Sequence, residues 1–537
     1  MQLVLRAGVG FLTGLLLWAP PIALSATADN SASQDYLVKV WGADEGLTEG
    51  SVTDVAQTPE GYLWVGTLFG SVLRFDGVRF VSYNSANTPE FSQKWGVPRL
   101  MVDRGGTLWI SMLDGGMTTW DKAGFRFAFT NANQPERLLW SAPGRVVFVF
   151  SDGKLLSGRR AGEQWNWENV TLPGALPHGQ YAADEEGGVW YLRGEHEIGV
   201  WNGKETKPLV LGPGLEGQAI KVLTADAKRR IWIGTDRDLA VWQTNHFEVM
   251  TPTNGEAVLA VKRVVPSGTG ELWVEANGHM RCCAERRWLA ESEGWSRELG
   301  KLRSLRFLHG DAKGGLWAGV GDMGLIHVRP DGTYVRLTTR EGLPSNTVHF
   351  AYQDREENTW LGYERGGLVQ VRRRLFRAIG KGKGLDENLI NTVCEDHQGT
   401  VWLGTHSGTV GRYENGVCTN LTLPGSARPQ DSSVVADALG RVWIGAQRLG
   451  LMLWETGEMR RVAAPEQPEG FARLMLPTRD GQMWVGTAGS VWSIVRLNEG
   501  EHTVVYSAQT AGEHPTALAE GANGTIWAGT LAGLLLR

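Results

Sequence analysis

The chain has 537 residues, of which 71 are Gly, 24 are Trp and 42% are hydrophobic. This composition is typical of a folded globular protein, and it excludes wholesale disorder and collagen-like repetition. The net charge of −5 lacks the excess of positive charge that is typical of nucleic-acid-binding proteins, so nucleic acid is not expected as a partner. Four Cys are too few for a disulfide scaffold.

The first 28 residues are predicted to be a signal peptide. Arg6 is the single charged side chain, residues 7–18 form an apolar core, and Ala26-Thr27-Ala28 suits a signal peptidase. The alternative, an uncleaved anchor, would need roughly 20 apolar residues to span a bilayer. We therefore expect an exported chain, periplasmic or extracellular, that is cleaved after Ala28.

Residues 36–41 (YLVKVW) form an apolar strand ahead of the first complete repeat. We predict that this spare outer strand closes a ring by pairing with a strand at the end of a blade. An unclosed ring would expose a strand edge and promote aggregation.

A short motif then recurs along the chain, first as LWVGT at 63–67 and later, for example, as VWLGT at 401–405. Its mean period is about 42 residues, and VVFVF at 146–150, with Phe148 in place of Trp, fills a gap of twice that length. Twelve repeats result. The predicted structural anchors are Trp64, Trp109, Trp190, Trp232, Trp273, Trp317, Trp360, Trp402, Trp443, Trp484 and Trp527.

One repeat illustrates the strand pattern within the period. Strands are predicted at 388–396, 401–405, 409–414 and 417–421, with an Asn-Gly hairpin turn at 415–416. A period near 42 with four short strands is typical of a propeller blade. The predicted fold class is therefore all-β, with tandem β-propellers of about 12 four-stranded blades and an incomplete second ring.

An acidic residue precedes many of the anchors in a polar, Gly-rich turn. We interpret these carboxylates as acceptors for backbone N–H groups in the turn rather than as metal or catalytic groups. The Trp rings are interpreted as packing between neighbouring blades. The acidic residues are Asp103, Asp226, Asp311, Asp354, Asp396, Asp437 and Asp480.

The four cysteines are predicted to be free or structural. Cys282 and Cys283 are adjacent, and Cys394 and Cys418 fall on the inner and outer strands of one blade. Strands that far apart in a sheet are separated by roughly 14 Å, which exceeds disulfide reach. No pair has the spacing of metal ligands, and neither a metal nor a cofactor is predicted.

Three segments, at 46–83, 342–371 and 384–416, resemble the two-component regulator propeller repeat. The resemblance implies an extracytoplasmic sensor with two seven-bladed propellers, an immunoglobulin-like linker, a membrane helix and a cytoplasmic output, commonly a histidine kinase and sometimes a diguanylate cyclase. Characterised relatives sense glycans or their breakdown products. Here the pattern has 12 repeats and reaches Arg537 in the third strand of a blade, so the C-terminal parts through which relatives signal and could dimerise are missing.

The repeats can be divided into two rings in two ways. Seven anchors in the first ring place it at 29–340, after the signal peptide, and leave five blades at 341–537. A division into six and six is the alternative.

Ligands of propellers are expected at the loops that join the second strand of a blade to the third and one blade to the next, because these loops gather on one face. Second-ring loops with Arg365, His406 and Arg448 could together bind an anionic sugar. The alternative is that these charges are simply solvated. The candidate ligand-binding residues are Phe69, Arg193, Arg237, Arg365, His406 and Arg448.

The function expected from this reasoning is sensing of a small molecule or oligosaccharide without turnover, in a two-component signalling protein. No catalytic residue is predicted, because no convincing carboxylate pair occurs on the inner strands and the H-E-x-x-H and G-x-S-x-G motifs are absent. Two alternatives stay open: a secreted scaffold that binds another protein, and a propeller lyase or glycosidase.

Overall fold

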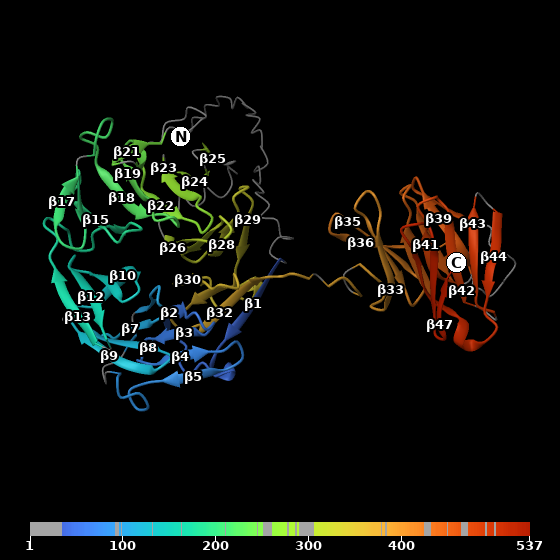
Figure 1. The fold of residues 1–537 in the computed structure, drawn as a ribbon, viewed down its shortest axis with the longest axis horizontal. Coiled ribbons are helices and arrows are strands. Elements are labelled where there is room, and N and C mark those ends of the chain that lie inside the picture. Colours follow the sequence, from blue (N-terminus) through green and yellow to red (C-terminus); the bar gives the residue numbers. More distant parts are fainter. Residues whose placement is uncertain are drawn as a thin grey trace, which may run out of the picture. The chain divides into compact units, whose positions relative to one another are not determined.

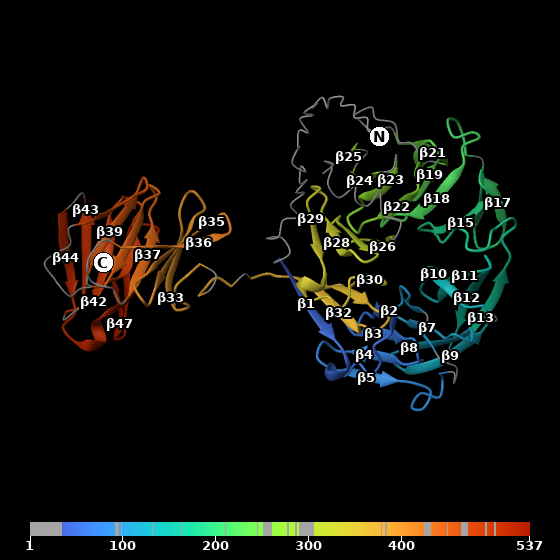
Figure 2. The same ribbon diagram turned by 180° about the vertical axis from the view of Figure 1, so that it is seen from behind.

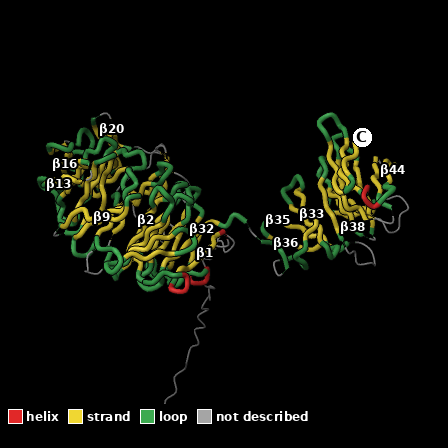
Figure 3. The backbone as a smooth tube through the Cα atoms, turned by 60° about the horizontal axis from the view of Figure 1, so that its bottom comes forward, coloured by secondary structure: helices red, strands yellow, loops and turns green. Residues whose placement is uncertain are grey.

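A computed structural model of the chain describes most residues from Asp35 onward. The described residues are 35–91, 96–97, 99–131, 133–162, 164–209, 211–243, 245–250, 260–276, 279–284, 287–288, 305–376, 378–381, 384–423, 431–447, 449–462, 471–488, 491–498 and 501–536. The predicted signal peptide lies outside them. Strands dominate the described chain (Figure 3), together with three short 3-10 turns at Ala43–Glu45, Thr339–Glu341 and Ala511–Glu513.

The chain divides into two compact units, residues 1–375 and 376–537. The first unit contains eight antiparallel sheets arranged in a ring (Figures 1 and 2). Sheets one to four are β2 (Val52–Gln57), β3 (Leu63–Thr67), β4 (Val72–Phe75) and β5 (Phe80–Tyr83); β6 (Arg99–Val102), β7 (Leu108–Ser111), β8 (Gly116–Asp121) and β9 (Gly124–Thr130); β10 (Pro135–Ala142), β11 (Arg145–Phe150), β12 (Leu155–Ala161) and β13 (Gln164–Val170); and β14 (Tyr181–Ala183), β15 (Val189–Arg193), β16 (Glu197–Trp201) and β17 (Thr206–Leu209).

Sheets five to eight complete the first unit. They are β18 (Ile220–Ala225), β19 (Ile231–Thr235), β20 (Leu239–Gln243) and β21 (His246–Val249); β22 (Arg263–Pro266), β23 (Leu272–Ala276), β24 (His279–Ala284) and β25 (Arg287–Trp288); β26 (Leu305–Gly310), β27 (Leu316–Val320), β28 (Gly324–Val328) and β29 (Tyr334–Leu337); and β30 (Phe350–Gln353), β31 (Thr359–Gly362) and β32 (Leu368–Arg373) with β1 (Tyr36–Trp41).

The N-terminal strand closes the first ring, as predicted for residues 36–41. β1 pairs antiparallel with β32, from Tyr36 opposite Arg373 to Trp41 opposite Leu368. The first strand of each sheet contacts the first strand of the next, and β2 also contacts β30 and β31, so the eight sheets form a complete circle.

The predicted division at residue 340 differs from the observed one, which lies between Leu375 and Phe376. The sheet anchored by Trp360 was assigned to the second ring, but it is the one that receives β1 and therefore closes the first. Neither the seven-plus-five nor the six-plus-six division matches the eight and four sheets of the two units. The pairing that decides the boundary joins strands more than 300 residues apart, and repeat periodicity carries no information about it.

The second unit contains four sheets. Three of them have four strands and the last has three. The strands are β33 (Ile390–Glu395), β34 (Val401–Thr405), β35 (Val410–Glu414) and β36 (Val417–Leu421); β37 (Ser432–Ala436), β38 (Val442–Ala446), β39 (Gly450–Glu455) and β40 (Glu458–Arg461); β41 (Phe471–Pro477), β42 (Met483–Ala488), β43 (Ser493–Asn498) and β44 (Glu501–Ser507); and β45 (Pro515–Glu520), β46 (Ile526–Thr530) and β47 (Gly533–Leu536).

The all-β propeller architecture was thus predicted correctly, and the strand bounds within one repeat were close. The predicted strands at 401–405 and 417–421 coincide with β34 and β36. The Asn-Gly turn between β35 and β36 has φ of 50° at Asn415 and 84° at Gly416. Positive φ at both central residues is typical of a type I′ hairpin turn.

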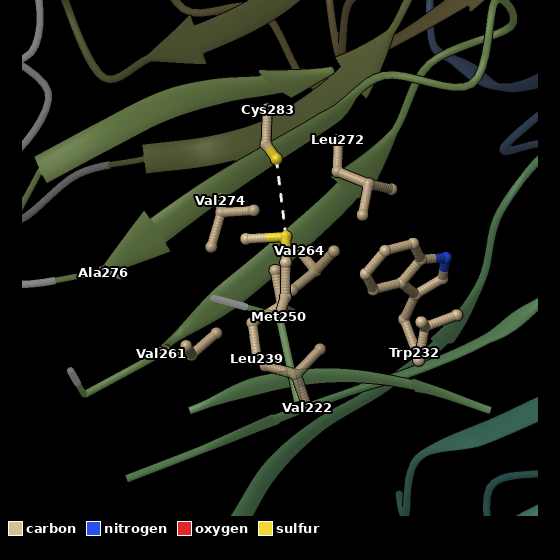
Figure 4. Close-up of a cluster of buried hydrophobic side chains, with 11 residues drawn as sticks. Val222, Trp232, Leu239, Met250, Val261, Val264, Leu272, Val274, Ala276 and Cys283 are labelled. Carbon is tan, nitrogen blue, oxygen red and sulfur yellow. Dashed lines mark hydrogen bonds between the residues drawn. The ribbon is translucent and has the colours of Figure 1, made fainter. Parts of the chain in front are cut away.

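The anchor Trp rings pack between neighbouring sheets, as predicted. Ten of the eleven are at most 8% exposed, and Trp527 in the last sheet is 38% exposed. Phe148, which replaces Trp in β11, is fully buried. Figure 4 shows one such contact, in which Trp232 lies in a cluster that joins two sheets, with Cys283 Sγ 3.5 Å from Met250 Sδ.

The acidic residues accept backbone N–H groups, as predicted. For example, Asp226 Oδ1 accepts the N–H groups of Lys228 (2.9 Å) and Arg230 (3.0 Å). They also have a role that we did not predict, because in five of them, and in Asp184, Oδ2 accepts the indole N–H of the Trp six residues later. Asp311 is an exception, since its Oδ2 lies 2.7 Å from His327 Nε2. The Trp Nε1 to Asp Oδ2 distances are 2.9 Å for Trp109–Asp103, 2.8 Å for Trp190–Asp184, 3.0 Å for Trp232–Asp226, 2.7 Å for Trp360–Asp354, 2.8 Å for Trp402–Asp396 and 2.8 Å for Trp443–Asp437.

Asp480 does not occupy the equivalent position. It lies four residues before its anchor, Trp484, and its carboxylate accepts the hydroxyl of Thr478 (2.5 Å) and the backbone N–H of Gln482 (3.4 Å). The other acidic residues all lie six residues before their Trp, so this interval in the sequence distinguishes them from Asp480. The same interval identifies Asp184, which the sequence analysis did not include.

The seam where the ring closes contains a chain of side-chain hydrogen bonds. The Tyr36 hydroxyl lies 2.6 Å from His327 Nδ1, and His327 Nε2 lies 2.7 Å from Asp311 Oδ2. The His327 ring stacks on Trp317, with ring centroids 4.1 Å apart. Burial raises the pKa of Tyr36. Burial also acts to raise the pKa of Asp311, but the hydrogen bond and charge of His327 outweigh it and lower that pKa.

The Gly of the recurring motif is explained by a close approach of the next sheet. A Cβ at Gly445 in β38 would lie 2.2 Å from the backbone oxygen of Ala472 in β41, and one at Gly404 would lie 2.7 Å from the backbone oxygen of Ser432. Real Cβ atoms do not approach backbone this closely, so a larger residue would force neighbouring sheets apart.

None of the four cysteines forms a disulfide. Cys394 and Cys418 lie in β33 and β36, the first and fourth strands of one sheet, as predicted. Burial raises the pKa of the Cys282 thiol to about 12 and that of Cys394 to about 11. These thiols are therefore protonated at neutral pH and serve as small apolar groups in the core.

Candidate functional site

A cavity of about 790 Å³ lies in the first unit. Its walls come from segments that are far apart in the sequence but neighbours in the ring. The lining residues are Ser51, Val52, Thr53, Leu68, Arg99, Gln134, Pro135, Glu136, Ser151, His178, His349, Phe350 and Glu364. We call this space the axial cavity, because the first strands of successive sheets contribute to it.

Two of the wall residues owe their place to irregular strand pairing. The register of β2 with β3 shifts between Val52 and Asp54, and that of β10 with β11 shifts between Pro135 and Arg137. Thr53 and Glu136 are therefore the extra residues of β-bulges. A bulge redirects a side chain that regular alternation would point elsewhere, which is why bulges are frequent next to binding sites.

Loops supply the rest of the wall. Leu68 and Ser151 directly follow β3 and β11, and Glu364 lies two residues after β31; these are the second strands of their sheets. Gln134 and His178 precede β10 and β14, the first strands of theirs. These are the two kinds of loop that the sequence predicted to share one face, so the cavity opens on the predicted side of the ring.

The polar groups of the cavity include both signs of charge. His349 Nε2 lies 3.9 Å from Glu364 Oε2, at the edge of ion-pair distance, and both side chains are partly exposed. The Ser51 hydroxyl donates to the backbone oxygen of Glu364. The Gln134 amide donates to the backbone oxygen of Leu113 (2.6 Å). Donors and acceptors beside the apolar Val52, Leu68 and Phe350 suit a polar ligand that has one apolar face.

Charged groups behind the wall are strongly affected by burial. Burial raises the pKa of Asp54 to about 6, although hydrogen bonds from the N–H groups of Leu100 and Val55 and the charge of Arg99 oppose the rise. Burial lowers the pKa of Arg137, whose guanidinium donates to the backbone oxygen of Tyr181. Burial, with the charge of Glu136, raises the pKa of Tyr181 to about 12.

A second cavity, of about 350 Å³, adjoins the seam and is lined by Tyr36, Trp317 and His327 among others. The His327 imidazole is already hydrogen-bonded to the Asp311 carboxylate. The Lys313 ammonium lies 2.5 Å from the Glu357 carboxylate. The axial cavity, which is larger and has more uncommitted polar groups, is therefore the better candidate.

The predicted ligand residues are divided between the two units. Arg365 belongs to the first unit, beside the cavity residue Glu364, whereas His406 belongs to the second unit. Arg448 lies outside the described residues. The predicted cluster of Arg365, His406 and Arg448 assumed three adjacent sheets of one ring, but the unit boundary lies between the Arg365 loop and the His406 loop, and a shared site stays a prediction.

The remaining predicted residues lie in first-unit loops. Phe69 is 55% exposed and follows the cavity residue Leu68. Arg193 is at the end of β15, with a buried Nε, and Arg237 lies 4.0 Å from Asp236 Oδ2. His406 Nδ1 lies 2.8 Å from Asp431 Oδ1. A ligand-binding role for these residues stays a prediction.

Sequence reasoning missed the cavity residues at the starts of the first strands, above all Arg99, Glu136 and His349. Their signal is a polar residue directly before or within the first strand of a repeat, where an apolar side chain is expected. Among the described residues, no group of three His, Cys, Asp or Glu side chains could hold a metal ion. No helix in the described part of the chain is long and apolar enough to cross a membrane.

Comparison with protein families identifies the repeat. The sequence profile described as "Two component regulator propeller" matches residues 46–69 and 384–407. The chain carries two-component regulator propeller repeats. One of the matched copies lies in each of the two units. No curated protein matches the sequence.

Solved structures with a similar arrangement of strands include extracellular domains of two-component systems. One is that of the putative hybrid two component system BT3049 from B. thetaiotaomicron, with 18% identity, a TM-score of 0.43 and coverage of 94% of this chain. The chain covers 65% of that protein's length, less than two thirds. Another is virginiamycin B lyase from Staphylococcus aureus, with 11% identity, a TM-score of 0.37 and coverage of 63% of this chain and 100% of that one.

Proposed function

We propose that this chain is the ligand-sensing part of an exported two-component signalling protein, and that it binds a small molecule or glycan fragment in the axial cavity without converting it. The observation that carries the proposal is the pairing of the regulator propeller repeat with a polar cavity of about 790 Å³ on the loop face of the first unit. The export of the chain rests on the predicted signal peptide and belongs to the same proposal.

The chemistry of the cavity supports a sugar-like ligand. Arg99, His178 and His349 can donate hydrogen bonds, Glu136 and Glu364 can accept them, and Phe350 offers an aromatic surface. Hydroxyl groups of a sugar both donate and accept, and one face of a pyranose ring is apolar. The cavity has room for a short oligosaccharide, since ligand pockets typically measure roughly 300–1,000 Å³.

The experiment is a binding screen followed by product analysis. The purified chain is titrated with a panel of mono- and oligosaccharides. After prolonged incubation the bound ligand is recovered, and its mass is measured by mass spectrometry. Saturable binding with the ligand recovered intact is the expected result. A ligand that is cleaved or eliminated by the chain would refute the sensing function and favour a lyase or glycosidase, whereas capture of a protein with no sugar binding would favour a scaffold.

A further inference from the structure

The cavity of about 350 Å³ beside the seam lies between the seventh and eighth sheets of the first unit. The seventh sheet contributes Trp317, His327 and the turn before β27, and the eighth contributes Tyr36 of β1 and Val371 of β32, among others. The axial cavity is lined instead by first strands and by the loops on the other side of the sheets, and the two cavities share no lining residue. We call the smaller space the seam cavity.

The seventh sheet departs from the repeat at this cavity. In six other sheets the carboxylate of an Asp accepts the indole N–H of the anchor Trp. Here His327 Nε2 lies 2.7 Å from Asp311 Oδ2 instead, and Trp317 Nε1 is buried without an acceptor among the described residues. A buried donor without an acceptor lowers stability, so this departure is not explained by packing alone.

A glycine keeps the seam cavity open. In three other sheets, the residue two positions before the anchor donates a hydrogen bond to Oδ2 of the Asp in the preceding turn. These residues are Arg230 (2.7 Å), Asn358 (2.8 Å) and Arg441 (2.7 Å). The Arg230 and Arg441 guanidinium groups also lie over the rings of their anchors, 5.5 Å from each centroid. The equivalent residue of the seventh sheet is Gly315, which lines the cavity, so no side chain from this position covers Trp317.

The acidic side chains of the seam cavity already have partners. The Glu357 carboxylate lies 2.5 Å from the Lys313 ammonium. The Asp331 carboxylate accepts the hydroxyl of Thr333 at 2.6 Å. Asp311 is bonded to the imidazole in the seam. The negative charges of the cavity are therefore committed within the protein.

The basic side chains are less fully engaged. Arg329 Nη2 lies 3.7 Å from the Asp35 carboxylate, and Arg373 is exposed and in no ion pair with any residue that the structure describes. Burial raises the pKa of Tyr36, and the charges of Arg329 and Arg373 both oppose that rise, so both cations lie near its hydroxyl. Arg373 is therefore available to an anion, beside a second guanidinium.

We propose that the seam cavity is a second ligand site, and that its ligand is a small aromatic carboxylate. The carboxylate binds Arg373 and Arg329, since a guanidinium can donate two parallel N–H groups to it. The aromatic ring packs against the apolar surfaces of Tyr36, Trp317 and Val371. The volume lies within the range of ligand pockets, roughly 300–1,000 Å³. This site is separate from the axial cavity and does not rest on the function proposed for it.

The test is calorimetric titration of the full chain with benzoate and naphthalene-2-carboxylate, each compared with its uncharged amide. Saturable binding is expected, with at least one carboxylate bound at least tenfold more tightly than its amide. Arg373→Gln should remove this tenfold preference. The matched control is Arg372→Gln, because Arg372 is also exposed in β32 but alternation points its side chain to the other face of the sheet. The control should bind both compounds as the unmodified chain does.

Hydrogen exchange locates the bound carboxylate, because a ligand stabilises the elements that it contacts. Exchange in β1 and β28 should slow at saturation, and Arg99→Ala in the axial cavity should leave the affinity unchanged. Absence of saturable binding overturns the proposal, as does equal affinity for carboxylate and amide. An equal loss in Arg372→Gln shows that only the overall charge matters. A loss in Arg99→Ala with no slowing in β1 places the carboxylate in the axial cavity and excludes a seam site.

Discussion

The buried carboxylate of Asp226 provides the sharpest prediction about stability. Its side chain is fully buried and its four hydrogen bonds hold the turn to the anchor strand. Oδ1 accepts the N–H groups of Lys228 and Arg230, and Oδ2 accepts Arg230 Nε at 2.7 Å and Trp232 Nε1 at 3.0 Å. Asp226→Ala removes the acceptor of all four donors at once.

The cost follows from the number of donors left without an acceptor. A donor stranded in the interior costs about 1–3 kcal/mol, and water will reach the partly exposed Arg230 side chain. We therefore expect Asp226→Ala to lower the free energy of unfolding by about 4 kcal/mol, as breaking a buried charged network usually does. Asp480→Ala, at a turn without the indole bond, should cost at most about 1 kcal/mol.

The assay is urea unfolding followed by hydrogen exchange, because sheets of a repeat protein can open separately. Asp226→Ala should lower the unfolding midpoint and speed exchange in β18 and β19, while exchange in the second unit stays unchanged. If Asp226→Ala and Asp480→Ala have equal effects, the indole bond and burial do not determine the contribution of these carboxylates, and the reasoning is wrong.

Three further predictions concern the seam, the buried acid and the sheet contacts. Tyr36→Phe, which removes the hydroxyl from His327 Nδ1, should lower the stability of the first unit by about 1 kcal/mol and speed exchange in β1. Because the folded pKa of Asp54, about 6, exceeds its ordinary value of 3.8, its contribution to stability is present below pH 4 and lost as pH rises to 6. The stability difference between the unmodified chain and Asp54→Asn should therefore change by up to about 3 kcal/mol over that range, and no change would contradict the raised pKa. Gly445→Ala should lower the melting temperature by several degrees, whereas Gly42→Ala, whose added methyl group would meet Glu45 at 3.6 Å, should leave it nearly unchanged.

Local features of the fold could be predicted from the sequence because the same sequence pattern recurs in each repeat. The period of Trp64 and its counterparts identified the sheets, and the composition of residues 36–41 identified the closing strand. The unit boundary could not be predicted, because it depends on which of several similar sheets receives β1. That choice is made by pairing and packing across the ring, including the bond between Tyr36 and His327.

The candidate site was predicted in part. The face of the ring followed from propeller topology, since every loop from the second to the third strand of a sheet lies on the same side. The residues did not follow, because the cavity depends on bulges that redirect Thr53 and Glu136, and bulges have no clear signature in a single sequence. The sequence analysis instead selected charged residues in loops, among them Arg237 and His406. In the structure these two side chains contact the carboxylates of Asp236 and Asp431.

The central claim, that the axial cavity binds a ligand without converting it, is tested most directly by calorimetric titration of two matched variants. For a sugar that binds the unmodified chain, Arg99→Ala should weaken binding at least tenfold, because Arg99 lines the cavity. Arg79→Ala, in an exposed turn between β4 and β5 of the same unit, should bind as the unmodified chain does, and the sugar should be recovered intact. Binding that survives Arg99→Ala but is lost in Arg79→Ala, or a sugar that is recovered cleaved, would contradict the account.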